Sequence, residues 1–163
     1  MKNQFKLLAA ALLFISVICS CSNEKKDAST DFELKIDQYV EYWNSGQFDD
    51  INNLLSDDFE IRSTPQFEPE KGIDTFMETV LNVRKSYPDF HITVEEVFYT
   101  ANAAAARWSI QASSKTGKKM NIMGMSILHF VDGKIKDEWI SNNDLQWLKE
   151  RDYIIMPPST DME

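Results

Sequence analysis

Alternating stretches in the second half of the chain constrain its fold more than any other feature. Apolar and polar residues alternate in four segments: His91–Tyr99, Ala103–Ser113, Lys119–Val131 and Lys134–Ser141. A period of two is typical of β-strands with one buried face. The connections are short, and Asp132-Gly133 is a typical hairpin turn, so the four strands are predicted to be antiparallel. Gly124 interrupts the longest strand and predicts a bend or bulge there.

The first half of the chain has helical spacing instead. In residues 31–45, Phe32, Ile36, Tyr39 and Trp43 recur on one helical face. Shorter helices are predicted over 48–55, 73–87 and 144–151, and a short strand over 58–63. Helices followed by strands indicate an α+β fold, with three N-terminal helices packed on one face of a curved antiparallel sheet. A sheet that curls over helices forms a cone, and its wide end is predicted to be a small-molecule pocket.

The N-terminus carries a different signal. Lys2 and Lys6 precede the apolar run Leu7–Ile18, which is too short to span a bilayer but fits the apolar part of a secretory signal peptide. The segment Ile18-Cys19-Ser20-Cys21 resembles a bacterial lipobox. This resemblance implies that Cys21 is the lipid attachment site and that the domain is anchored in the bacterial cell envelope, on the periplasmic side or at the cell surface.

The predicted organisation therefore has four parts. Residues 1–20 are a lipoprotein signal peptide, 21–30 a polar tether, 31–151 the folded domain and 152–163 an irregular C-terminal tail. Both cysteines fall in the first 21 residues, so the domain is expected to need no disulfide. The net charge of −9 argues against nucleic acid as a partner. No metal site is expected, because the two histidines are on separate strands, and no cofactor-binding motif is present.

An ordered set of short motifs resembles a known family. The first motif is Tyr42-Trp43-Asn44-Ser45-Gly46. The second is Tyr87-Pro88-Asp89-Phe90, which leads into the predicted strands. The third is Phe130-Val131-Asp132-Gly133-Lys134, followed by Glu138-Trp139. Together they resemble the SnoaL-like polyketide cyclases of the nuclear transport factor two-like superfamily, over about residues 35–150. The resemblance implies the cone-shaped α+β fold. In the cyclases, an acid at the end of the last strand acts as general acid and base in an aldol ring closure.

The chain departs from the cyclase pattern at the catalytic position. The resemblance places the acid at Asn143, which cannot take up a proton, and Asp144 follows one residue later. The family's histidine at the end of the first strand is replaced by Arg62-Ser63. Asn143 and Asp144 are also good helix N-cap residues, and Asn143 with Gln146 resembles a capping box. These positions can therefore be catalytic or structural.

The remaining candidate site residues come from strand and helix faces. Glu138 shares a face with Asn142 and is, with Asp144, a candidate acid/base. Trp139 points to the opposite face and is predicted to lie in the core. Seven residues are candidates for the ligand pocket: Trp43, Met77, Trp108, Met123, His129, Asn142 and Asn143. Ordinary core or surface roles are the alternative for each of them.

Three functions fit these patterns. The leading interpretation is a membrane-anchored domain that binds a small, largely apolar molecule in its cone, without established catalysis. The first alternative is a cofactor-free cyclase, isomerase or dehydratase that uses Asp144 or Glu138. The second is an interaction module of the cell envelope, in which the exposed sheet face forms a homodimer.

Overall fold

The computed structural model describes residues 21–63, 68–114, 117–150, 153–154 and 156. The helices are α2 (Cys21–Ser45), α3 (Ile51–Leu54), α4 (Ile73–Ser86) and α5 (Asp144–Glu150). The strands are β1 (Leu55–Ser63), β2 (Glu70–Lys71), β3 (His91–Tyr99), β4 (Ala103–Ser113), β5 (Lys119–Val131) and β6 (Lys134–Asn142). None of the helices in these ranges is long and apolar enough to cross a membrane.

The strands form one six-stranded sheet in the order β2-β1-β6-β5-β4-β3. Neighbouring strands from β3 to β6 are antiparallel, whereas β1 pairs with β6 in parallel. Asp132 and Gly133 both have positive φ, which fits a hairpin turn whose twist matches that of the strands β5 and β6. The predicted α+β fold with a curved sheet is confirmed.

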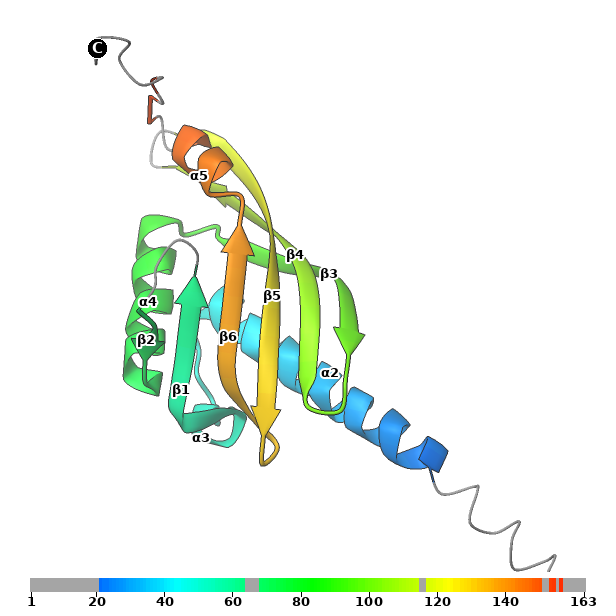
Figure 1. The fold of residues 1–163 in the computed structure, drawn as a ribbon. Coiled ribbons are helices and arrows are strands. Elements are labelled where there is room, and N and C mark those ends of the chain that lie inside the picture. Colours follow the sequence, from blue (N-terminus) through cyan, green and yellow to red (C-terminus); the bar gives the residue numbers. More distant parts are fainter. Residues whose placement is uncertain (1–20, 64–67, 115–116, 151–152, 155, 157–163) are drawn as a thin grey trace, which may run out of the picture.

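Helix α2 crosses one face of the sheet, α4 lies beside the β1–β2 end, and α5 lies at the tip of the sheet, after the end of β6 (Figure 1). The apolar face of α2 supplies buried Phe32, Ile36 and Tyr39 to the core. The side chain of Asn44 exchanges two hydrogen bonds with the backbone of Ile92, at 2.7 and 3.0 Å, and thereby ties the end of α2 to the edge strand β3. The helix ends at Ser45, and Gly46 follows with a φ of 70°, a conformation that is strained for residues other than glycine.

Several boundaries differ from the sequence-based prediction. Helix α2 begins at Cys21, so the segment 21–30 predicted as a tether is helical, consistent with its Glu, Lys and Ala residues, which favour helices. The short strand β2 pairs with β1 and was not predicted. The predicted signal peptide, residues 1–20, and most of the predicted tail lie outside the described residues.

Of the bend or bulge predicted at Gly124, the bulge is absent. Gly124 pairs in regular register with Trp108 on β4 and with Asn142 on β6. The register of β5 with β6 shifts elsewhere, between His129 and Phe130. Gly124 is required for a different reason: a Cβ there would lie 2.2 Å from Cη2 of Trp108. The glycine therefore makes room for an indole ring on the inner face.

Candidate functional site

A cavity of ≈ 170 Å³ lies between α2 and the inner face of strands β3 to β6. Most of its wall is apolar, which suits a ligand with little polar surface. The lining residues are Ile36, Tyr39, Val40, Trp43, Phe90, Ile92, Val94, Ala106, Trp108, Ile110, Ile122, Ser126, Leu128, Glu138, Ile140 and Asn142. The volume is close to the roughly 150 Å³ of a cavity that accommodates benzene in another protein. It therefore fits a molecule of about one ring.

Glu138 is the acidic residue of the cavity wall. Only 6% of its surface is exposed, because the inward side of β6 faces α2. The hydroxyl of Tyr39 on α2 donates a hydrogen bond of 2.6 Å to Oε2 of Glu138. The Ser126 hydroxyl is also hydrogen-bonded to the carboxyl group. Two hydroxyl groups from different elements thus fix the orientation of the carboxyl.

The second hydroxyl is itself held by an indole. Nε1 of Trp108 donates a hydrogen bond of 2.8 Å to Oγ of Ser126. Because Ser126 accepts this bond, its own proton is available for Glu138. The indole can occupy this position because Gly124 has no side chain. A line of contacts therefore runs from Gly124 through Trp108 and Ser126 to Glu138.

Burial changes the acid–base properties of this cluster. Burial raises the pKa of Glu138 above its usual range, and the hydrogen bonds from Ser126 and Tyr39 partly offset the increase. Burial, and then the neighbouring charge of Glu138, raise the pKa of Tyr39 well above its usual value. The phenol therefore stays protonated as a donor, and the carboxyl can exchange a proton closer to neutral pH than an exposed glutamate can.

Four of the residues predicted for the site line the cavity. They are Trp43 on α2, Trp108 on β4, and Glu138 and Asn142 on β6. The ring of Trp43 also contacts Phe90 at a centroid distance of 6.1 Å. The structure thus brings one predicted acid and three predicted wall residues together.

Three predicted pocket residues lie elsewhere. Met123 and His129 are on the opposite face of β5, because their positions alternate with those of the inward residues, and Met123 is 60% exposed. Met77 packs against the core from α4, a helix that contributes no residue to the cavity. The prediction that these three side chains line the pocket was wrong.

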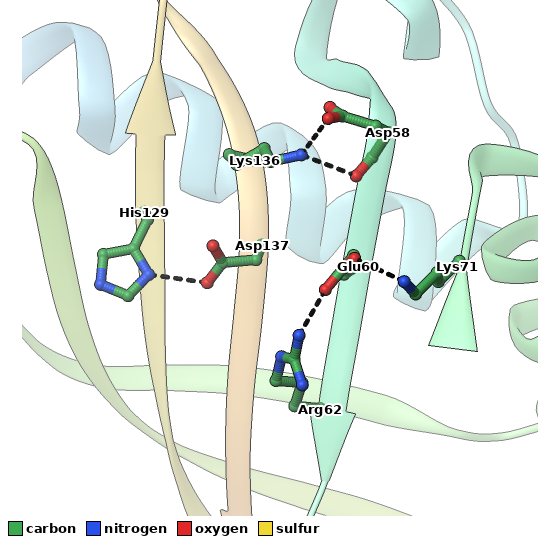
Figure 2. Close-up of polar contacts among 7 residues, drawn as sticks. All are labelled: Asp58, Glu60, Arg62, Lys71, His129, Lys136 and Asp137. Atoms are coloured by element: carbon green, nitrogen blue, oxygen red, sulfur yellow. Dashed lines mark hydrogen bonds and ion pairs between the residues drawn. The ribbon is translucent and has the colours of Figure 1, made fainter. Parts of the chain in front are cut away.

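The outer face of the sheet carries paired charges (Figure 2). Nδ1 of His129 lies 2.6 Å from Oδ1 of Asp137, and Glu60 contacts both Arg62 and Lys71. His129 therefore pairs with Asp137 on the outer face and does not line the cavity. Trp139, which the sequence placed in the core, is 52% exposed on this face, where the Arg62 guanidinium lies 5.2 Å from its ring centroid.

Asn143 and Asp144 lie at the start of α5 and do not line the cavity. Oδ1 of Asn143 accepts a hydrogen bond of 3.0 Å from the backbone N–H of Gln146, as a helix cap does. Oδ1 of Asp144 accepts one of 2.8 Å from the amide of Asn142. The placement of Asn143 in the pocket was therefore wrong, and Asp144 is not positioned as the pocket acid.

Sequence reasoning missed Tyr39 and Ser126 as site residues. Ser126 is a lone hydroxyl on an inward strand face that otherwise reads Ile122, Gly124, Leu128 and Phe130. A single polar residue on such a face was the available signal, because buried polar groups need a partner. The hydroxyl of Tyr39 gave no comparable signal, since the residue fits an ordinary apolar helix face.

Across the described ranges, no group of three or more His, Cys, Asp or Glu residues is arranged to hold a metal ion. The chemistry that the described site offers is thus a carboxyl group, two hydroxyl groups and an amide at an apolar cavity.

Comparisons with known proteins point to one family. Residues 33–151 match the family described as SnoaL-like polyketide cyclase. No curated protein matches the chain. Many solved structures share the fold, and three of them show the extent of the likeness. A proposed polyketide cyclase from Bacillus cereus ATCC 10987 is 22% identical, with a TM-score of 0.66 over 74% of this chain and 80% of that one.

The second structure is IdmH, a proposed polyketide cyclase from Streptomyces antibioticus, which is 18% identical with a TM-score of 0.66 over 74% of this chain and 97% of that one. The third is a phenazine biosynthesis-related protein from Pseudomonas aeruginosa, also 18% identical, with a TM-score of 0.62 over 85% of this chain and 97% of that one. At these identities the likeness concerns the fold.

Proposed function

Because the chain belongs to the SnoaL-like polyketide cyclase family, we propose that its cavity binds a small, largely apolar molecule. The observation that carries this proposal is the apolar cavity of ≈ 170 Å³ with a buried carboxyl group on its wall. The apolar wall favours burial of the ligand's body, and Glu138 with Tyr39 can orient one polar group. Binding of this kind needs no catalytic step.

Filling the cavity tests the proposal. Ala106 lines the cavity, whereas the neighbouring Ala105 faces outward beside Ile127. We expect benzyl alcohol to bind the wild-type protein in calorimetric titrations, and Ala106→Leu to weaken binding at least about tenfold by occupying the space. Ala105→Leu is the matched control and should leave binding unchanged. Equal affinity in the two variants, or no binding by the wild type, would contradict the proposal.

A second candidate function is acid–base catalysis. The raised pKa of the buried Glu138 favours it, because a carboxyl tuned towards neutral pH can remove or return a proton. Hydrogen–deuterium exchange at the carbon next to the carbonyl of cyclohexanone is a direct assay. The enzyme hypothesis predicts accelerated exchange that Glu138→Gln abolishes. Exchange at the buffer rate with the wild-type protein would argue against this carbon-acid chemistry.

The outer sheet face supports self-association as a further proposal. Phe98, Ile127 and Trp139 lie in one cross-strand row and are each about half exposed or more. Exposed apolar groups of this kind are typical of protein contact surfaces. If this face forms a homodimer, light scattering should show a dimer at micromolar concentration, and Trp139→Glu should convert it to a monomer. A wild-type monomer would exclude the dimer.

Membrane attachment completes the proposal. The lipobox-like sequence before Cys21 supports lipidation at that residue and a location in the bacterial cell envelope. The residues of the proposed signal peptide lie outside those the structure describes, so this part of the proposal is based on sequence. The anchor would hold the ligand-binding domain at the membrane without contact between the acidic domain and the lipid.

A further inference from the structure

Among the residues that the structure describes, no basic side chain pairs with the buried carboxyl group of Glu138. Its hydrogen-bond partners are the hydroxyl groups of Tyr39 and Ser126, which are neutral. Over the ranges that the structure describes, the ion pairs of lysine, arginine and histidine involve other acids, and none involves Glu138. A buried carboxylate is stable only beside a partner of opposite charge, and without one it takes up a proton instead. The cavity beside Glu138 is where such a partner would fit.

The cavity wall is also suited to a cation. It contains no lysine, arginine or histidine, but it presents the aromatic rings of Tyr39, Trp43, Phe90 and Trp108. Aromatic faces attract cations through the negative potential of their π-electrons, and the attraction is stronger where water is excluded. An anionic ligand would instead meet Glu138 with no basic side chain on the wall to balance its charge. The net charge of −9 also favours a cationic ligand, because it attracts cations to the protein.

We infer that the ligand of this cavity is an organic cation, with a protonated amine that pairs with Glu138 and an apolar body of about one ring. The inference rests on the proposed function, because it assumes that the cavity is a ligand pocket. A carboxylate can accept about four hydrogen bonds, and Tyr39 and Ser126 provide two. The remaining acceptor positions are available to an ammonium group, which has three donors. Trp108 holds Ser126, so the carboxyl is oriented before the ligand arrives.

Three probes of similar shape separate the effect of charge from that of size. Benzylamine is a cation at neutral pH, benzyl alcohol is neutral and benzoate is an anion, and all three carry one ring. Calorimetric titration of the wild-type protein should give at least about tenfold tighter binding for benzylamine than for benzyl alcohol, and no binding of benzoate. Glu138→Gln should remove the preference for the amine while retaining benzyl alcohol binding.

Asp137→Asn provides the matched control. Asp137 is the neighbour of Glu138 in sequence, but its carboxyl lies on the outer face beside His129 (Figure 2), so this variant should keep the preference for the amine. If Glu138→Gln does not fold, the comparison of the three probes on the wild-type protein still decides the question. Equal affinities for benzylamine and benzyl alcohol would overturn the inference and leave the proposed function intact. Failure of all three probes to bind would overturn both.

Discussion

A single methyl group at Gly124 should disturb the site more than its size suggests. The Cβ of Gly124→Ala would lie 2.2, 2.4 and 2.7 Å from the Cη2, Cζ2 and Cζ3 atoms of Trp108. All three distances are far below van der Waals contact, so the indole must move. Trp108 is 9% exposed and packed in the core, and its Nε1 bond to Ser126 would be lost or lengthened.

The size of the effect follows from these contacts. Overpacking of a core typically costs about 1–3 kcal/mol. Loss of the bond from Trp108 to Ser126 adds about 0.5–1.5 kcal/mol. Alanine at a position whose φ it can adopt stabilises by about 0.4–1 kcal/mol, because it restricts the unfolded chain. The free energy of unfolding should therefore fall by about 0.5–4 kcal/mol in Gly124→Ala.

A double-mutant cycle with Trp108→Phe isolates the contact. Phenylalanine lacks the far part of the indole that meets the new Cβ. In the Trp108→Phe background, Gly124→Ala should therefore cost nothing or stabilise by up to about 1 kcal/mol. Urea denaturation followed by circular dichroism gives the four free energies of unfolding. If Gly124→Ala costs the same in both backgrounds, contact with the indole does not explain the glycine.

Burial raises the pKa of Glu138 in the folded state, so the folded protein holds this proton more tightly than the unfolded chain and loses stability as pH rises. The free energy of unfolding of Glu138→Gln should therefore rise relative to that of the wild type as pH increases. If the two curves of unfolding free energy against pH are parallel, this prediction is contradicted. Asn143→Ala removes the hydrogen-bond acceptor for the N–H of Gln146 and should lower the free energy of unfolding, measured by chemical denaturation, by about 0.5–2 kcal/mol. An unchanged free energy of unfolding would contradict the capping role. Cys21→Ser should release the protein from membranes in cell fractionation, and continued membrane retention would contradict lipidation at Cys21.

Local patterns predicted the strands well. The bounds of β3, β4 and β5 agree with the alternating segments, because the period of two and the turn residues are both local signals. The parallel pairing of β1 with β6 was not predicted, since it joins residues such as Ile61 and Glu138 that are far apart in sequence. The two-residue strand β2 carries too few residues to show a period.

The site was only partly predictable. Alternation correctly placed Glu138 and Asn142 on one face of β6, but it could not say that this face points inward. The hydrophobicity of Trp139 predicted a buried side chain, but Trp139 is exposed and its neighbour Glu138 is buried. The bond from Tyr39 to Glu138 joins residues 99 positions apart, and only the packing of α2 on the sheet brings them together.

Methyl NMR during a titration with benzyl alcohol tests the central claim most directly. Ile122 and Leu128 line the cavity, whereas Met125 and Ile127 lie on the outer face of the same strand. If the cavity is the binding site, the methyl signals of Ile122 and Leu128 shift and saturate while those of Met125 and Ile127 stay in place. Shifts confined to Met125 and Ile127, or no saturable shift at all, would contradict the claim that a small apolar molecule binds in the cavity.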